Sequence, residues 1–466
     1  MSNVALKRSQ VQDDSPTARG GEKYVFIVSH VFPYPPLGGH ELRILNLMKW
    51  LRSEGYRVVL VLSQEIENQS SVERLSTLAD HVHWLTPPWW TRLGRRLPGL
   101  RRVLWENTKR LINPLWDQFL RTAESEAYPP INSSAGELES KKAVSSPRLA
   151  ELTSRLARKY HPVAVIAEYI LLTDCLALLP PNVLKIIDTI DVFSLKENQV
   201  ANFGIVEPWT CTREEEREYL LRGEVIIAIQ NREATILKNL VPEREVITVG
   251  VDYDIPDSVP GRLADPNLIT VVGSDNPKNV HGLRSFLAEC WPEIKSAHPS
   301  AILNVIGRVG PLCQVTDPNV KYLPAVENLT EIYQRSRVAI NPCAAGTGLK
   351  IKSVEALAHG RPLVAWPHGV DGLEYSGDAP YLKCESWKEF ASAVVRILKS
   401  DGEAQALSER ALAYARVRFG PATVYAQLRT RLAEQRGVEE ESAVKAQQLA
   451  PASPTYPAES ERIASI

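Results

Sequence analysis

The sequence predicts an α/β protein built from two doubly wound, Rossmann-like domains that face each other across a cleft. Three observations lead to this prediction. Short apolar runs alternate with amphipathic helical stretches in both halves of the chain. A loop containing glycine follows a strand in each half, at the edge where doubly wound sheets bind ligands. At 466 residues, the chain is also too long for a single hydrophobic core.

The bulk composition excludes several classes of protein. The 54 Lys and Arg residues balance 55 Asp and Glu residues, so no excess of charge argues for nucleic acid binding. The six cysteines form no C-x-x-C pair, which is typical of reduced thiols rather than of a disulfide framework or a zinc site. No apolar run approaches the ~20 residues of a membrane span, and the N-terminus lacks the apolar core of a signal peptide. We therefore expect a soluble, cytoplasmic protein.

The first half begins with a βαβ unit. Residues 24–28 are apolar enough for a buried parallel strand. A loop with Gly38 and Gly39 follows, then a helix of about 15 residues and a second strand at 58–62. Gly-Gly alone is a weak signal, because a turn that needs a positive φ explains it equally well. The absence of G-x-G-x-x-G argues against a dinucleotide fingerprint.

The alternation is interrupted between residues 64 and 150, which we interpret as an insertion. Within it, residues 89–121 carry eight basic and two acidic residues with four interleaved tryptophans. This composition is typical of a segment that lies on an anionic membrane surface. The alternative is an ordinary set of domain helices with tryptophans in the core and arginines in solvent. Nucleic acid would also suit Arg and Trp, but the rest of the chain offers no fold for it.

Two carboxylates follow strands of the first half. Glu168 comes directly after a predicted strand at 163–167, and Asp191 comes shortly after one at 184–187. Because the carboxyl ends of parallel strands form the binding edge of a sheet, both are candidate contacts for an acceptor or a sugar. The alternative is that either caps the N-terminus of a helix.

The second half contains the most informative stretch, residues 338–360. It predicts a buried strand, a loop of small residues with Gly346 and Gly348, and a helix. The free amides at the start of such a helix suit a phosphate. Lys352 and Glu355, one turn further in, are placed to hold a second phosphate oxygen and a sugar diol. The alternative is a solvated i, i+3 pair worth about 0.2–0.5 kcal/mol.

Five stretches together resemble a retaining glycosyltransferase of the GT-B fold, of the family 4 (group 1) type. They are residues 36–43, 272–283, 305–308, 346–364 and 369–373, of which the fourth is the most specific. The resemblance covers about residues 22–435 and is weakest across 64–160. It implies a hexosyltransferase that forms an α-linkage with retention during assembly of a surface or extracellular polysaccharide or glycoconjugate.

The resemblance also implies a domain organisation. A disordered tail at 1–20 would precede an acceptor-binding domain at 21–250. A nucleotide-sugar-binding domain would occupy residues 251–420. The terminal helix, at 421–435, would cross back onto the first domain, and a disordered tail would follow at 437–466. The protein would act in the cytoplasm, at the inner face of the cell membrane if residues 89–121 touch the bilayer and the acceptor is lipid-linked rather than a free glycan.

The resemblance assigns roles to individual residues. Glu355 would hold the ribose hydroxyls of the donor, and Lys352 would lie by its diphosphate together with the loop amides. Arg308 is a further candidate for the reaction centre. No metal or other cofactor is expected, because helix-end amides and a cation can stabilise the leaving diphosphate. The full set of candidate donor-binding residues is Gly38, Gly39, Lys278, Gly346, Thr347, Gly348, Leu349 and Glu355.

Three departures from the family pattern bear on activity. Thr347 stands where the family has the first of two glutamates eight positions apart. Ser274 and Asn279 stand in place of an arginine and a lysine, for which Lys278 or Arg308 can substitute, and Ile190 replaces a histidine. Two other hypotheses therefore stay open: a catalytically inactive partner protein that binds sugar nucleotides, and a nucleotide-sugar epimerase. A two-domain protein with an unrelated ligand is the least specific alternative.

Overall fold

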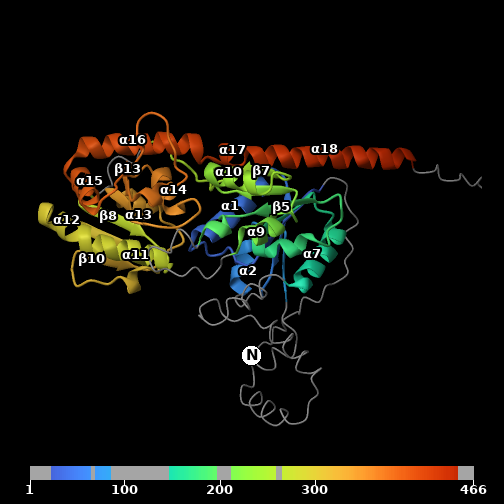
Figure 1. The fold of residues 1–466 in the computed structure, drawn as a ribbon, viewed down its shortest axis with the longest axis horizontal. Coiled ribbons are helices and arrows are strands. Elements are labelled where there is room, and N and C mark those ends of the chain that lie inside the picture. Colours follow the sequence, from blue (N-terminus) through green and yellow to red (C-terminus); the bar gives the residue numbers. More distant parts are fainter. Residues whose placement is uncertain (1–21, 65–68, 86–145, 197–210, 259–264, 450–466) are drawn as a thin grey trace, which may run out of the picture.

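The computed structural model describes residues 22–64, 69–85, 146–196, 211–258 and 265–449. Two parallel sheets with helices on both faces form two bodies side by side, so the predicted two-domain α/β class is confirmed (Figure 1). The expected tail at 1–20 and the basic, tryptophan-rich stretch at 89–121 lie outside the described residues.

The first sheet has seven parallel strands in the order β3-β2-β1-β4-β5-β6-β7. The strands are β1 (Tyr24–Ser29), β2 (Arg57–Leu62), β3 (His81–Trp84), β4 (Ala164–Glu168), β5 (Leu184–Asp188), β6 (Val225–Ala228) and β7 (Glu245–Thr248). The helices are α1 (Gly39–Ser53), α2 (Gln69–Leu75), α7 (Pro147–Tyr160), α9 (Arg213–Leu220) and α10 (Asn231–Leu240), with 3₁₀ turns at η1 (Ile170–Leu176) and η2 (Phe193–Leu195).

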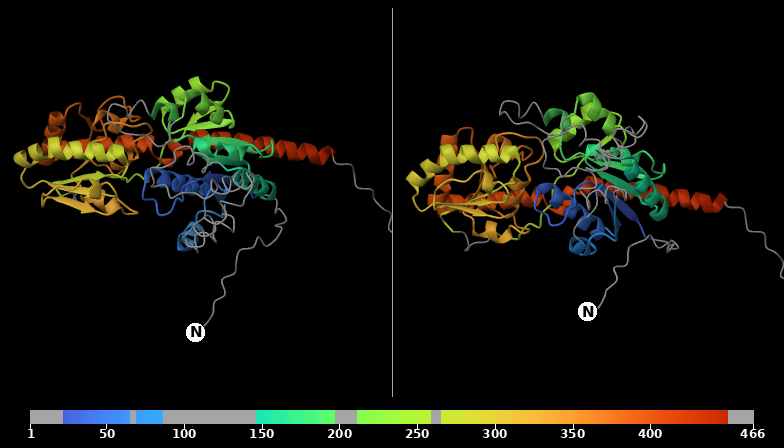
Figure 2. Two further views of the ribbon diagram at one scale, coloured as in Figure 1. Left: turned by 60° about the horizontal axis from the view of Figure 1, so that its bottom comes forward. Right: turned by 90° about the horizontal axis from the view of Figure 1, so that it is seen from below.

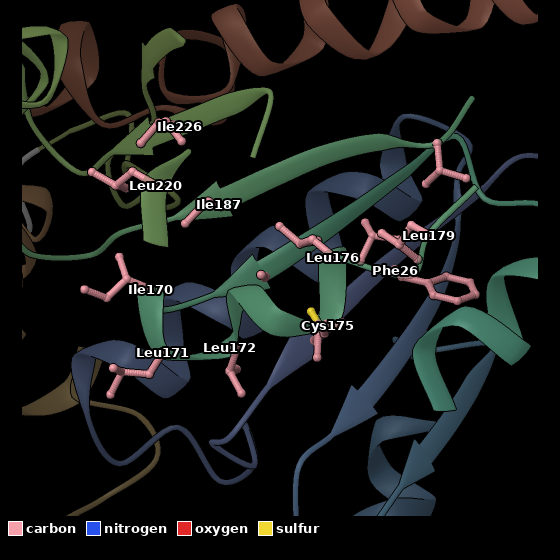
Figure 3. Close-up of a cluster of buried hydrophobic side chains, with 14 of the residues drawn as sticks. Phe26, Ile170, Leu171, Leu172, Cys175, Leu176, Leu179, Ile187, Leu220 and Ile226 are labelled. Atoms are coloured by element: carbon pink, nitrogen blue, oxygen red, sulfur yellow. The ribbon is translucent and has the colours of Figure 1, made fainter. Parts of the chain in front are cut away.

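Both faces of the central strands of this sheet are buried, which explains why these strands are continuous apolar runs. Phe26 on β1 packs into a cluster with η1 and with Leu220 of α9 (Figure 3). Its neighbour Ile27 points to the opposite face and packs against Met48 and other residues of α1. The sheet therefore has two hydrophobic cores, one on each side.

The expected insertion at 64–150 is wrong in part. Residues 69–84 form α2 and β3, and β3 pairs in parallel with β2 as the edge strand of the sheet. The pattern hides this strand because its sequence, His-Val-His-Trp, has no apolar run. An edge strand has a partner on one side only, and here all four residues stay partly exposed.

The second sheet has six parallel strands in the order β10-β9-β8-β11-β12-β13. They are β8 (Leu268–Val272), β9 (Ile302–Ile306), β10 (Val320–Leu323), β11 (Val338–Asn341), β12 (Leu363–Ala365) and β13 (Leu382–Lys383). The helices are α11 (Pro277–Ser285), α12 (Trp291–Ala297), α13 (Thr330–Arg335), α14 (Ile351–Ala358) and α15 (Trp387–Lys399), with a π turn at η4 (Phe286–Cys290) and 3₁₀ turns at η5 (Gly310–Leu312) and η6 (Pro367–Val370). The strand order reverses between β1 and β4 in the first sheet and between β8 and β11 in the second. Such a reversal places a crevice at the carboxyl ends of these strands.

The chain ends with three helices that run from the second body back to the first, α16 (Asp401–Arg418), α17 (Pro421–Val424) and α18 (Ala426–Leu449) (Figure 2). Val424, Tyr425, Leu428 and Leu432 are buried in the core that α1 forms with the first sheet. The tail expected to be disordered from residue 437 is helical as far as Leu449. Good helix formers such as Glu, Ala, Lys and Gln fill residues 439–449, and the next proline is Pro451.

None of the helices in the described part of the chain combines the length and the hydrophobicity that crossing a bilayer requires.

Candidate functional site

A cleft between the two bodies contains a pocket of about 280 Å³. The first body lines it with Pro36, Leu37, Gly38, Gly39 and Leu42. The second body contributes Val272, Gly273, Ser274, Asn279, Ile306, Gly307, Arg308, Ala325, Val326, Glu327, Leu329, Leu349, Lys350, Ile351, Lys352 and Glu355. Residues from the two halves of the sequence thus share one cavity at the carboxyl edges of both sheets.

Gly38 and Gly39 form the narrow wall of this pocket on the side of the first sheet. They precede and begin α1, with Gly38 in an extended conformation at the N-cap. A Cβ on Gly39 would lie 2.6 Å from Cδ1 of Ile351, at the start of α14 in the opposite body. Close approach of the two bodies, rather than a positive φ, therefore requires glycine at this position.

Lys352 and Glu355 both face the pocket from α14. The Lys352 ammonium donates to Oδ1 of Asn279, 2.5 Å away, and burial lowers the pKa of Lys352. The Tyr333 hydroxyl donates to Oε2 of Glu355 at 3.4 Å, and burial raises the pKa of Glu355 to about 7. The two residues do not pair with each other as a solvated i, i+3 pair. Each is held by a different neighbour and directed to the cavity.

The N-terminal end of α14 offers backbone donors to the pocket. Leu349 and Lys350 line the cavity, and their amides have no acceptor among the described residues. No side chain caps this helix end. The amide of Gly348 is different, because it donates to Oε1 of Glu233 at 2.8 Å. An anion in the pocket would thus meet the Leu349 and Lys350 amides and the positive end of the helix dipole.

Of the other predicted site residues, Arg308 lines the pocket, whereas Lys278, Gly346, Thr347 and Gly348 do not. The Arg308 guanidinium lines it and pairs with exposed Asp275 at 3.1 Å. Lys278 lies on α11 beside the loop, since a Cβ on Gly346 would come within 3.0 Å of Lys278 Cδ. The Thr347 hydroxyl points away to Asp191, at 3.1 Å. Asn279, which stands where the family has a lysine, instead accepts from Lys352.

The ionisation of Glu355 predicts how nucleotide binding depends on pH. An ionised carboxylate accepts hydroxyl hydrogen bonds more strongly than a neutral acid, and its pKa is about 7. If only the ionised form binds, the dissociation constant of a nucleoside diphosphate falls about tenfold from pH 6 to pH 8. Calorimetry with wild type and Glu355→Gln checks this. The titration of the nucleotide's own phosphate affects both proteins and cancels in their ratio, so equal slopes would exclude a role for Glu355.

Comparisons with known proteins agree with this geometry. Residues 266–400 match a family model described as glycosyl transferases group 1. The expected resemblance to group 1 glycosyltransferases is confirmed over these residues, whereas the expectation of a retaining enzyme of the family 4 type stays a prediction. No curated protein sequence matches the chain, but solved glycosyltransferase structures share the fold of both bodies. A mutant of S. aureus TarM, in a complex with fondaparinux, α-GlcNAc-glycerol and UDP, aligns with a TM-score of 0.61 at 10% identity. The alignment covers 88% of this chain and 99% of that one.

Two further structures extend the comparison. Sucrose-phosphate synthase from Thermosynechococcus elongatus aligns with a TM-score of 0.61 at 14% identity, over 90% of this chain and 100% of the synthase. The pneumococcal O-GlcNAc transferase GtfA, in complex with UDP and GlcNAc, aligns with a TM-score of 0.60 at 10% identity, over 89% of this chain and 99% of GtfA. At such low identities the likeness establishes the fold alone, and the fold is GT-B.

In this GT-B chain, the carboxyl edge of the first sheet holds a cluster of titratable residues next to Gly39. Glu168 at the end of β4 is fully buried, and His40 Nε2 lies 3.6 Å from its Oε2. The ring centroids of His30 and Tyr169 lie 5.2 Å from each other, and each lies 5.5 Å from that of His40. Burial raises the pKa of Glu168 to about 7 and lowers that of His40 to about 4. Glu168 does not cap a helix, and its side chain is inaccessible to solvent in this structure, so contact with an acceptor stays a prediction.

The buried Glu168 carboxyl predicts a pH-dependent stability. Its pKa is raised from 4.5 to about 7 in the folded protein, which therefore binds more protons than the unfolded chain between these values. The stabilisation by the neutral acid is present below pH 4.5 and is lost as pH rises to 7. Glu168→Gln cannot ionise, so its free energy of unfolding relative to wild type should rise by up to about 3 kcal/mol from pH 5 to pH 8.

Urea unfolding at both pH values checks this prediction. Glu224→Gln changes a carboxylate that pairs with Lys185 in a partly exposed position, and it serves as the matched control. A difference between Glu168→Gln and wild type that is the same at pH 5 and pH 8 would show that Glu168 does not titrate in this range.

Asp191 has a different environment from the one that either sequence alternative predicts. Its Oδ2 pairs with Lys196 at 3.0 Å, and its Oδ1 accepts from Thr347 of the opposite body. It does not cap a helix in the described chain: η2 begins after Val192, without a side-chain cap. Sequence reasoning missed three residues of the site, Lys350, Glu233 and Tyr333, and it named Asn279 only as a departure from the family pattern. Only Lys350 had a local signal, as a lysine within the glycine loop.

Proposed function

We propose that this protein transfers a hexosyl group from a nucleotide-sugar donor to a glycan or lipid-linked acceptor. The reaction would retain the anomeric configuration and form an α-linkage, in the assembly of a surface or extracellular polysaccharide or glycoconjugate. One observation carries the proposal. The interdomain pocket brings together a free helix N-terminus and the partly buried side chains of Lys352 and Glu355, all of which lie within the residues that match the glycosyltransferase family model.

The chemistry of transfer explains why these groups lie together. As the bond between C1 of the sugar and the phosphate oxygen breaks, negative charge grows on the diphosphate and positive charge on the sugar ring. The Lys352 ammonium and the amides of Leu349 and Lys350, which belong to residues that line the pocket, would stabilise the diphosphate without reorganising. The carboxylate of Glu355 would accept the two ribose hydroxyls. The acceptor hydroxyl would attack C1 and give its proton to the leaving phosphate.

We further propose that the reaction needs no metal ion, because Lys352 and the helix end supply the positive potential that a divalent cation would otherwise provide. The acceptor would enter along the first sheet's wall of the cleft. The protein would work in the cytoplasm, at the inner face of the cell membrane if the acceptor is lipid-linked. Activity that is unchanged by EDTA would support a reaction without a metal ion. Activity that is higher with vesicles containing anionic lipid than with vesicles lacking it would support action at the membrane.

Thermal stabilisation by UDP, GDP and ADP tests the donor site. A nucleotide at about 100 times its dissociation constant should add about 2.7 kcal/mol to the free energy of unfolding. The proposal expects this for one of the three in wild type and not in Glu355→Ala. Glu374→Ala, on an exposed loop of the second body, is the matched control. No stabilisation by any of the three would contradict the proposal.

Product analysis separates the alternatives. Release of nucleoside diphosphate only when an acceptor is present, with an α-linked product by NMR, supports the transferase. Interconversion of two nucleotide-sugars without an acceptor would indicate an epimerase. Thr347 provides one reason to test for an inactive binding partner, because it replaces a family glutamate. Nucleotide binding without turnover of any donor over a broad panel of acceptors would favour that alternative.

A further inference from the structure

The loop that leads into α14 is shaped from two sides. On one side, the Lys350 ammonium donates to three successive carbonyls, those of Gly346, Thr347 and Gly348, at 2.9, 2.7 and 3.3 Å. Both glycines have a positive φ, 119° and 76°, which lets the backbone turn its carbonyls toward one cation. Lys350 therefore fixes the direction of the peptide groups just before the free amides of the pocket.

On its other side, the loop contacts two carboxylates of the first body. The Thr347 hydroxyl donates to Oδ1 of Asp191 at 3.1 Å, and the Gly348 amide donates to Oε1 of Glu233 at 2.8 Å. A Cβ on Gly348 would clash with Oδ1 of Asp191. The contact is therefore tight, and it joins segments 156 and 115 residues apart in the sequence.

The first body holds Asp191 firmly. Ile190, directly before it, has a φ of 58°, an unfavourable conformation for a β-branched residue. Lys196 pairs with Asp191 at 3.0 Å, and its ammonium lies 3.7 Å from the centre of the Phe193 ring. Burial tends to raise the pKa of Asp191, but Lys196, with Lys278 and Lys350, outweighs this and lowers it. An ionised carboxylate thus meets the loop.

Glu233 is held less completely. It lies on the first turn of α10 and is 4% exposed. Its Oε1 accepts from the Gly348 amide at 2.8 Å and from Nε2 of Gln230 at 3.4 Å, while its buried Oε2 has no hydrogen-bond donor among the described residues. A buried oxygen without a donor costs stability, and the Gln230 bond from the first body is long. The shorter hydrogen bond comes from Gly348 in the opposite body.

We propose that Asp191 and Glu233 position the donor-binding loop from the opposite domain, so that donor affinity depends on contact between the two sheets. Both are positioning residues, since they act through Thr347 and Gly348 rather than on the donor. The inference rests on the proposed function of the pocket. It also gives Thr347 a role: in place of a glutamate directed at the substrate, this chain has a hydroxyl that fastens the loop to the first domain.

Paired substitutions test the inference through nucleotide affinity. Thr347→Val removes the hydroxyl donor, whereas Thr347→Ser keeps it. Glu233→Leu removes the acceptor of the Gly348 amide, whereas Glu233→Gln keeps one. Thr235→Val, on an exposed face of α10, is the matched control. The probe is whichever of UDP, GDP and ADP binds wild type best, measured by calorimetry beside the donor and acceptor KM values.

The inference expects Thr347→Val and Glu233→Leu to weaken binding about tenfold each, as for a lost hydrogen bond to a charged or strained group. Thr347→Ser and Glu233→Gln should stay within about twofold of wild type, and the KM of the acceptor should not move. Should Glu233→Leu fail to fold, the Thr347 pair decides alone. Unchanged affinity in Thr347→Val overturns the inference but leaves the proposed function intact. No nucleotide binding by wild type would overturn the proposed function itself.

Discussion

Replacement of Arg43 by methionine should lower the free energy of unfolding by about 3–5 kcal/mol, the usual cost of removing one partner of a buried ion pair. Arg43 on α1 is 3% exposed and donates to both carboxylate oxygens of Asp188, which is fully buried at the end of β5. Its other terminal nitrogen donates to the carbonyl of Gly250. The substitution would leave a buried carboxylate without its cation and a linker carbonyl without a donor.

Urea unfolding of three variants checks this result. Arg43→Met combined with Asp188→Leu should recover most of the lost stability, because no charge is then left unpaired. Arg217→Met removes a partly exposed pair with Glu243 and a hydrogen bond to the carbonyl of Leu240, and it should cost less, because solvent screens such a pair. A loss in Arg43→Met as small as that of Arg217→Met would show that the buried pair does not hold the first body together.

The Arg43 contacts also explain how one helix serves both the cleft and the linkers between the bodies. Gly39 at the start of α1 lines the pocket. Further along, Asn46 donates to the carbonyl of Asp252 at 2.8 Å, and the Trp50 ring stacks on Tyr425, with centroids 4.3 Å apart. Asp252 and Tyr425 lie on the two segments that connect the bodies. The helix α1 therefore contacts both linkers and the pocket, so a shift of either linker would also move the pocket wall at Gly39.

Most of the fold was predictable because its signals are local. Strands buried on both faces, such as β1 and β4, are continuous apolar runs. The edge strands lack this signal: β3 contains two histidines, and β13 has only two residues. The length of α18 beyond residue 437 was missed for a related reason. A polar helix without an apolar stripe has no periodicity that distinguishes it from a disordered tail.

Some residues of the site were also predictable from local signals, and others were not. Gly346, Lys352 and Glu355 belong to one strand–loop–helix segment, so their spacing in the sequence predicts their relative positions. Several hydrogen-bond partners at the site come from distant parts of the sequence. Asn279 is 73 residues from Lys352, and Glu233 is 115 residues from Gly348. Sequence patterns within one segment contain no information about such pairs, because only the topology of the sheets brings them together.

Replacement of Lys352 by methionine should lower kcat about 10²–10³-fold, the range typical of losing one preorganised donor to a developing negative charge. The Lys352 side chain is partly buried beside the free amides of the pocket, and Asn279 holds its ammonium in place. Methionine has a similar length and no charge, whereas burial of the lysine disfavours its charged form and lowers its pKa. The free energy of unfolding should therefore stay the same or increase, while kcat falls.

A comparison with the neighbouring lysine separates catalysis from folding. Lys350→Met removes the donor to three loop carbonyls, so it should reduce the stability of the protein and its nucleotide affinity together. Lys352→Met should leave the melting temperature in place and act mainly on kcat with saturating donor. Lys383→Met, on the edge strand β13, is the exposed control. If Lys352→Met keeps its kcat, the leaving diphosphate draws its stabilisation from the helix end alone, and the lysine only fills space beside Asn279.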